Sequence, residues 1–262
     1  MKRRFISAIS ALTGEGRLYE IDTRLRPSGS SGPVASHLDA FRRYHREDAW
    51  TWEHMALTRA RVVAASDDSL TQDLNQVVRE VLLTPRDADR VVVEVADMRR
   101  RIAQEHGTED CWQVKHVRGG LVDLEFLAQQ LQLIHGPDMP GLLLGDTALV
   151  LARAGELGLI EDGAMLADAV RLQRRMLGLL RLTVTGRFDG RTAPPGLIAA
   201  LARAARLDEG ADAEAIGDVL RSCQARVHAH FDRYVTDVAA RVKAEGAADA
   251  GADPKTAMET KR

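Results

Sequence analysis

The sequence has few of the features that mark disulfide-rich, membrane-spanning or nucleic-acid-binding proteins. Its two cysteines, Cys111 and Cys223, lie far apart and outside any Cys-x-x-Cys pair, so we expect buried free thiols rather than a disulfide or a metal site. No apolar run reaches the roughly 20 residues of a transmembrane helix. The formal net charge of −2 lacks the basic excess typical of nucleic-acid binders. Without a secretory signal pattern either, we expect a cytoplasmic protein with no membrane or nucleic-acid partner.

The 262 residues are enough to bury a sizeable core in one or two domains, and most of the chain has helical periodicity. A first short helix is expected over 3–12, and another begins near Leu121. Apolar residues also recur at helical spacing over 69–83, 87–106, 146–157, 168–183 and 213–242. From about Ala244 this periodicity ends, which predicts a disordered tail.

A strand-and-turn pattern over residues 18–29 contains the first candidate site. β-Forming Tyr, Ile and Thr alternate with other residues until Pro27 ends the pattern. A strand would place Asp22, Arg24 and Arg26 on one face, because side chains two apart point the same way. The carboxylate offers a hard oxygen to Mg²⁺, and the guanidinium groups bind phosphate oxygens. From the spacing alone, a surface strand whose charges neutralise one another is the better interpretation.

Two later segments, read together with this strand, indicate a family. Residues 47–54 read Glu-Asp-Ala-Trp-Thr-Trp-Glu-His, and residues 118–126 read Arg-Gly-Gly-Leu-Val-Asp-Leu-Glu-Phe. In this order the motifs resemble those of the glutamine synthetase adenylyltransferases, bacterial enzymes that add AMP to glutamine synthetase and remove it. The 47–54 segment resembles the C-terminal, adenylylating half. The resemblance extends beyond Leu133, and more loosely to about Tyr234.

The resemblance implies transfer of AMP from ATP to a tyrosine of glutamine synthetase, with Mg²⁺ held by three carboxylates. Asp22 matches the third carboxylate, and Arg24 and Arg26 would orient phosphates or hold Asp22. Family members carry a Gly-Ser and an Asp-x-Asp pair upstream, whereas this chain begins after that position. The nearest similar stretch, Ser66-Asp67-Asp68, lies downstream with a different spacing. We therefore expect half of a catalytic site, and no useful AMP transfer by this chain alone.

A helix predicted over 49–64 contains further candidates for phosphate binding. The resemblance places it behind or beside the active site, where Arg59 or Arg61 could reach a phosphate. Trp50 and Trp52 are expected in the core. Glu53 is a further functional candidate, with a local pairing as the alternative interpretation.

The glycines of the 118–126 segment precede the helix that begins near Leu121. Gly119 and Gly120 allow close backbone approach, and the free N–H groups of a helix start favour anions. Lys115 and Arg118 add positive charge, so these four residues are candidates for contact with ATP.

Several charged residues have alternative interpretations. Asp123 and Glu125 do not share a helix face, so we expect them to favour the helix start electrostatically, with a site-lining role as the second interpretation. The triple arginine 99–101 is expected to face water. His228 and His230 are two apart, a poor spacing for a helical metal site, and are expected at the surface.

We therefore predict a mainly α fold. Residues 1–64 would be the C-terminal part of a nucleotidyltransferase domain with a small α/β remnant, residues 65–243 a helical bundle, and residues 244–262 a disordered tail. The alternative to AMP transfer is a non-catalytic helical module that binds glutamine synthetase, a PII-type signal protein or a complementary enzyme half. Phosphorolytic removal of AMP is a third interpretation, against which the Trp-Thr-Trp wording argues.

Overall fold

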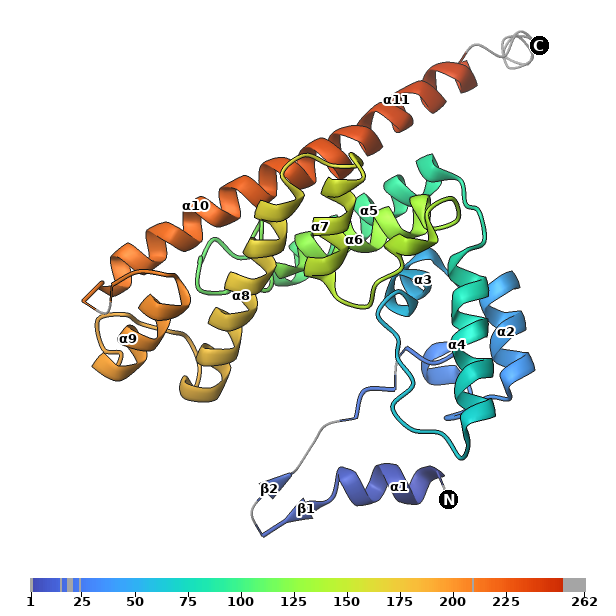
Figure 1. The fold of residues 1–262 in the computed structure, drawn as a ribbon, viewed down its shortest axis with the longest axis horizontal. Coiled ribbons are helices and arrows are strands. Elements are labelled where there is room, and N and C mark those ends of the chain that lie inside the picture. Colours follow the sequence, from blue (N-terminus) through green and yellow to red (C-terminus); the bar gives the residue numbers. More distant parts are fainter. Residues whose placement is uncertain (1, 15, 18–20, 24, 209, 252–262) are drawn as a thin grey trace, which may run out of the picture. The chain divides into compact units, whose positions relative to one another are not determined.

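The structure is a computed structural model that describes residues 2–14, 16–17, 21–23, 25–208 and 210–251. It divides into two compact units, residues 1–84 and 85–262. Both are built mainly from helices, as predicted (Figure 1). No helix in the described part is long and apolar enough to cross a membrane.

The first unit combines short helices with a minimal hairpin. Leu12 pairs with Arg17, and Thr13 with Gly16, in an antiparallel two-stranded ladder. The elements of this unit are α1 (Lys2–Ile9), β1 (Leu12–Thr13), β2 (Gly16–Arg17), the 3-10 turn η1 (Gly29–Ser31), α2 (Leu38–Glu47), α3 (Thr51–Leu57) and α4 (Asp68–Leu82).

The strand predicted from residue 18 is absent from the described residues of that segment. Residues 21–23 have no regular structure, and residues 25–28 form turns and a bend, while residues 18–20 and 24 lie outside the described part. A strand needs a neighbour to pair its N–H and C=O groups, and the only ladder in the described chain joins β1 to β2. The α/β remnant is therefore not confirmed.

The helix predicted over 49–64 is also shorter than expected, because α3 ends at Leu57. The Thr58 hydroxyl donates to the Met55 carbonyl oxygen at 2.7 Å and so offers the backbone a local alternative to a further helical turn. Met55 and Leu57 fill the buried face of α3. Trp50 and Trp52 are instead 65% and 39% exposed, so their assignment to the core was wrong.

Glu53 is the buried polar residue of α3, and it makes the local contacts of its alternative interpretation. Its Oε1 accepts the Tyr44 hydroxyl at 2.8 Å, and its Oε2 accepts the Trp50 amide at 2.9 Å. Both carboxylate oxygens therefore have donors within the first unit.

Asp67 shows what the Ser66-Asp67-Asp68 stretch does. Its carboxylate accepts the Leu70 amide at 2.9 Å, together with the hydroxyls of Ser69 and Ser66. These contacts, the amide first, lower the pKa of Asp67. The stretch is thus the N-cap of α4.

The predicted boundary at residues 64 and 65 differs from the division of the structure at residues 84 and 85. α4 packs against α2 and α3 and therefore belongs to the first compact unit. The assignment of residues 1–64 to a nucleotidyltransferase domain stays a prediction.

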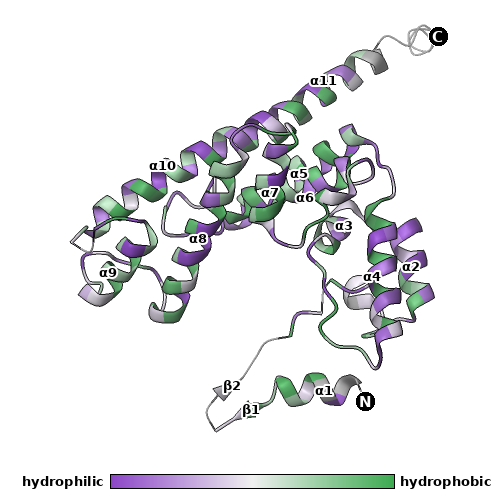
Figure 2. Cartoon of the chain, viewed as in Figure 1, coloured by the Kyte–Doolittle hydropathy of each residue, from purple (hydrophilic) through white to green (hydrophobic). Residues whose placement is uncertain are grey.

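The second unit is a helical assembly around α6, whose residues are buried on nearly every side and which packs against α5, α7, α8 and α10. Its elements are α5 (Ala88–His106), α6 (Leu121–His135), the 3-10 turn η2 (Pro140–Leu142), α7 (Thr147–Glu156), α8 (Gly163–Thr183), α9 (Pro195–Ala204), α10 (Ala213–Phe231), the π-helical segment η3 (Asp232–Thr236) and α11 (Asp237–Gly251). α10, η3 and α11 follow one another as a single rod (Figure 1). Hydrophilic and hydrophobic residues alternate along this rod, as expected when one face lies in the core (Figure 2).

The rod extends further than the sequence predicted. α11 continues to Gly251, so residues 244–251 are helical where the disordered tail was expected to begin. Alanine is frequent there, and it has the highest intrinsic helix propensity, which favours helix without an apolar stripe. Residues 252–262 lie outside the described part.

Candidate functional site

Asp22 and Arg26, two of the predicted metal and phosphate residues of the first unit, lie in an irregular segment. Asp22 is exposed. The Arg26 guanidinium turns back onto its own loop: Nη1 donates to the Thr23 carbonyl oxygen at 2.7 Å and to its Oγ1 at 2.6 Å, and Nε donates to the Gly32 carbonyl oxygen at 3.2 Å. Arg24 lies outside the described residues. In this structure Arg26 closes a loop, and its phosphate contact stays a prediction.

The described residues do not by themselves form a metal site. Within that part of the chain, no group of three or more His, Cys, Asp or Glu side chains is placed to hold a metal ion. Asp22 therefore supplies at most one of the three carboxylates that the family resemblance implies.

Arg59 and Arg61 are exposed in the segment between α3 and α4. The sequence predicted that both arginines lie on a helix, but α3 ends at Leu57, before either of them. Their contact with a phosphate likewise stays a prediction.

The double glycine of the second unit is needed for packing. Gly119 has a φ of +75°, and a Cβ there would lie 1.8 Å from the Gln224 carbonyl oxygen of α10. A Cβ at Gly120 would lie 2.6 Å from the Val114 carbonyl oxygen. Only glycine lets this turn lie against α10 and lead into α6.

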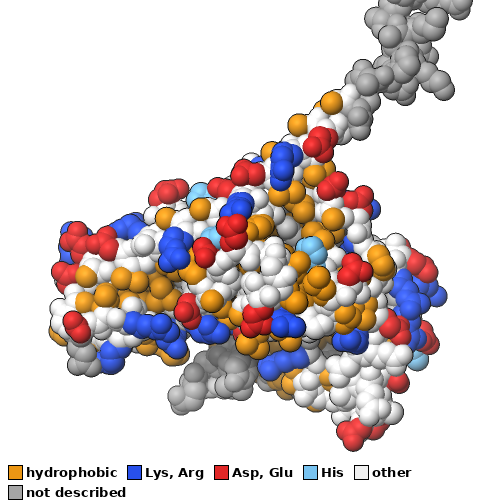
Figure 3. Space-filling model, turned by 45° about the horizontal axis from the view of Figure 1, so that its top comes forward, with side chains coloured by type: hydrophobic (Ala, Val, Ile, Leu, Met, Phe, Trp, Pro, Cys, Tyr) orange, Lys and Arg blue, Asp and Glu red, His pale blue; other side chains and the backbone are white. Residues whose placement is uncertain are grey.

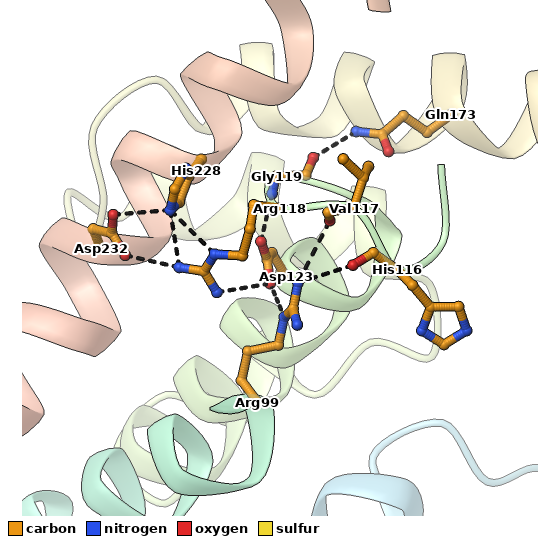
Figure 4. Close-up of polar contacts among 9 residues, drawn as sticks. All are labelled: Arg99, His116, Val117, Arg118, Gly119, Asp123, Gln173, His228 and Asp232. Atoms are coloured by element: carbon orange, nitrogen blue, oxygen red, sulfur yellow. Dashed lines mark hydrogen bonds and ion pairs between the residues drawn. The ribbon is translucent and has the colours of Figure 1, made fainter. Parts of the chain in front are cut away.

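The start of α6 already has an anion, the carboxylate of Asp123. Its Oδ2 accepts the Gly119 amide at 2.5 Å, and the Gly119 carbonyl oxygen accepts Gln173 Nε2 at 2.9 Å (Figure 4). The Gly119 amide, one of the predicted phosphate donors, thus donates to a side chain of the same chain, and the phosphate contact of this turn stays a prediction. Asp123 does favour the helix start, from a fully buried position.

The partner of Asp123 is Arg99, which was wrongly expected in water. Its Nε donates to Asp123 Oδ1, and its Nη2 lies 3.3 and 3.4 Å from the carbonyl oxygens of His116 and Val117. Arg99 is 1% exposed, whereas Arg100 and Arg101 are exposed as predicted. The missed signal is spacing, because Arg99 follows the buried Val95 by four residues and so shares its helix face.

Arg118 joins this pair to the rod. Its Nη2 donates to Asp232 Oδ1 at 3.0 Å, its Nε donates to His228 Nε2 at 3.1 Å, and its Nη1 lies 3.9 Å from Asp123 Oδ1 (Figure 4). The guanidinium also lies over the Phe231 ring, 5.6 Å from its centroid. His228 is half-buried here rather than a simple surface residue.

These contacts occur where the rod changes from α to π geometry. Asp232 is the first residue of η3, and the Tyr234 carbonyl oxygen within it accepts Gln130 Nε2 of α6 at 3.1 Å. A π segment displaces the regular hydrogen-bond pattern by one residue, and such segments are frequent at functional sites. We call Arg99, Arg118, Asp123, His228 and Asp232 the arginine junction.

The arginine junction is nearly balanced in charge, since its two guanidinium groups face two carboxylates. It therefore holds the turn before α6 against α5 and the rod, and it presents little excess positive charge to a phosphate. Lys115 is exposed on the same turn. Beside it, burial first and Lys115 second lower the pKa of His116.

The two cysteines are free thiols, as expected. Cys111 is buried, whereas Cys223 is partly exposed. Burial raises the pKa of both thiols.

Two family models match parts of the chain. Residues 1–77 match the model described as glutamate-ammonia ligase adenylyltransferase, and residues 94–235 match the model described as GlnD PII-uridylyltransferase. The second match covers the helices that build the arginine junction.

Curated relatives are similar over most of the chain. A protein of Rhodopseudomonas palustris strain TIE-1, named bifunctional glutamine synthetase adenylyltransferase/adenylyl-removing enzyme, is 43% identical over 235 residues, which are 89% of this chain and 23% of the relative. Proteins of the same name from Xanthobacter autotrophicus and Bradyrhizobium diazoefficiens are 44% identical over 239 residues (90% of this chain, 24% of the relative) and 47% identical over 204 residues (77% and 20%). The chain spans about a quarter of the length of these relatives.

Proposed function

This chain belongs to the glutamine synthetase adenylyltransferase family, and from that premise we propose that it takes part in transferring AMP from ATP to a tyrosine of glutamine synthetase. The observation that carries the proposal is the 43% identity over 89% of the chain. The identity extends across both compact units rather than over a single motif.

In this reaction the tyrosine oxygen forms a bond to the α-phosphorus of ATP. The bond from that phosphorus to the oxygen bridging to the β-phosphorus breaks, pyrophosphate leaves, and the phenol proton passes to a base. Mg²⁺ would stabilise the charge on the phosphates. The described residues do not complete a site for it, so we assign no metal-dependent step to this chain.

Within the proposal, Asp22 contributes one carboxylate to a site that the family's Gly-Ser and Asp-x-Asp segments complete. Arg24, Arg26, Arg59 and Arg61 are the candidates for phosphate contact in the first unit. Lys115 is the candidate in the second unit, because it is exposed while Arg118 is committed to protein partners.

The second candidate function is a non-catalytic helical module that binds glutamine synthetase, a PII-type signal protein or a complementary enzyme half. The charge balance of the arginine junction favours it. Arg118 and Gly119, two of the predicted ATP contacts, already donate to Asp232 and Asp123.

The deciding experiment is transfer of label from α-labelled ATP to glutamine synthetase in the presence of Mg²⁺. The arms are this chain alone, a fragment of the Rhodopseudomonas relative that holds the family's Gly-Ser and Asp-x-Asp segments, and the two together. We expect label only when both are present. Asp22→Asn should abolish it, whereas the control Asp68→Asn, at the start of α4, should not.

Labelling that does not change with Asp22→Asn would contradict the role of this carboxylate. Binding of the chain to glutamine synthetase without label in any arm would support the helical module instead.

A further inference from the structure

A cavity of about 480 Å³ lies in the second unit, between α8, the end of α9 and α10, and none of its lining residues belongs to the arginine junction. The volume is within the usual range of small-molecule sites. Its floor is apolar and includes Met165, Ala169, Leu172 and Val219. Apolar and basic side chains lie next to one another at the left of Figure 3, over the end of the unit that holds α9 and α10.

The rim of this cavity is positively charged. Four arginines line it, against the two aspartates Asp168 and Asp218. Each aspartate already pairs with an arginine one helical turn away, Asp168 with Arg171 at 2.9 Å and Asp218 with Arg221 at 2.6 Å.

The other three rim arginines, Arg175, Arg206 and Arg226, have no carboxylate partner among the residues that the structure describes. All three are exposed. Guanidinium groups bind carboxylates and phosphates through paired N–H donors, so this rim is suited to an anionic group.

Arg206 has an unusual backbone for an arginine. It follows the C-cap of α9 with a φ of +59°, while its amide donates to the Arg203 carbonyl oxygen and the Leu207 amide donates to the Ala202 carbonyl oxygen at 2.9 Å. Glycine is the usual residue here, since a side chain disfavours the left-handed conformation. This chain instead has an arginine here, and its guanidinium lines the cavity although the left-handed backbone conformation disfavours any side chain.

We propose that this cavity binds a small organic anion whose carboxylate or phosphate faces Arg175, Arg206 and Arg226 and whose hydrocarbon part lies on the apolar floor. The proposal concerns a site apart from AMP transfer and does not depend on it. Both parts of the ligand are needed, because a fully solvated anion gains little from exposed arginines and the apolar floor alone does not select charge.

Cys223 provides a direct readout, because it lines the cavity while Cys111 is buried elsewhere. We would alkylate the full chain with a maleimide and follow each cysteine by mass spectrometry. The probes are octanoate, acetate and octanol, which supply both parts, the anionic group alone and the hydrocarbon alone. Octanoate should slow labelling of Cys223 at concentrations at which acetate and octanol do not.

Arg206→Gly separates binding from folding, because glycine relieves the backbone conformation while removing the guanidinium. We expect an unchanged or higher melting temperature and an octanoate affinity at least about tenfold weaker. Arg226→Gln should also weaken octanoate protection, whereas the matched control Arg241→Gln, on α11 and outside the lining, should not. Equal protection by octanoate and octanol, or protection unchanged in Arg206→Gly and Arg226→Gln, would overturn the proposal.

Discussion

The buried pair of Arg99 and Asp123 leads to a quantitative prediction about the stability of the second unit. Asp123→Asn keeps the shape of the side chain and an oxygen that can accept the Gly119 amide, but it removes the negative charge and turns an NH2 donor toward Arg99 Nε. Arg99 would then be a buried cation whose remaining partners are two carbonyl oxygens at 3.3 and 3.4 Å.

Removing one partner of a buried ion pair typically costs about 3–5 kcal/mol, because the other charge stays buried without compensation. Asp123→Asn should fall at the upper end of that range. Arg99→Met should cost less, about 3 kcal/mol, because Asp123 keeps the Gly119 amide at 2.5 Å and Arg118 Nη1 at 3.9 Å. The double variant should cost no more than Asp123→Asn alone, which gives a coupling of about 3 kcal/mol or more.

Urea unfolding followed by Trp112 fluorescence measures these values. Trp112 packs against Phe188 in the second unit, with ring centroids 4.4 Å apart. Replacing the exposed Trp50 and Trp52 by Phe makes Trp112 the only tryptophan. A cost below about 1 kcal/mol for Asp123→Asn, or additive costs in the double variant, would refute the buried-charge argument.

Three further predictions concern single positions. Burial, and then His54, lower the pKa of His45 to about 4. The stability that this neutral histidine contributes is complete above the unfolded pKa near 6.5 and is lost as the pH falls toward 4. Urea titrations at pH 7.5 and 5 should therefore differ by about 2 kcal/mol in the free energy of unfolding, and His45→Leu should remove most of that difference. Gly119→Ala should cost about 3 kcal/mol or more, because the residue has a positive φ and its new Cβ would clash with Gln224. In the same assay Gly178→Ala should stabilise by about 0.5–1 kcal/mol, because this glycine lies within α8 and a Cβ there would have no atom within 4 Å. Equal effects of the two substitutions would contradict the packing argument. Asp146→Ala should lose about 1 kcal/mol more than Asp146→Asn, because Asn can still accept the amides at the start of α7, and thermal melts that show no difference would remove the capping role.

Local rules explain the helices that the sequence predicted correctly. Asp67, Asp87 and Asp146 precede apolar periodic segments, and each side chain caps the helix that follows it. Such caps depend on residues only a few positions apart, so they can be predicted without knowledge of the fold.

Non-local pairing explains the failures. The strand expected from residue 18 required a neighbouring strand, which no local pattern could supply. Trp50 and Trp52 were assigned to the core from their residue type, whereas the buried side of α3 is occupied by Met55 and Leu57. The family resemblance, in contrast, was evident from a few motifs in order, and the similarity to curated relatives confirms it.

The sequence by itself therefore determined the helical class and the family, because helical periodicity and motif order depend on residues that lie close together in the sequence. Only the tertiary structure decided the arginine junction. Arg99, Arg118 and His228 come from α5, the turn before α6 and α10, and they meet because those elements pack around α6. The same three residue types are solvated in an isolated helix, and burial beside Asp123 and Asp232 is what turns them into a specific network.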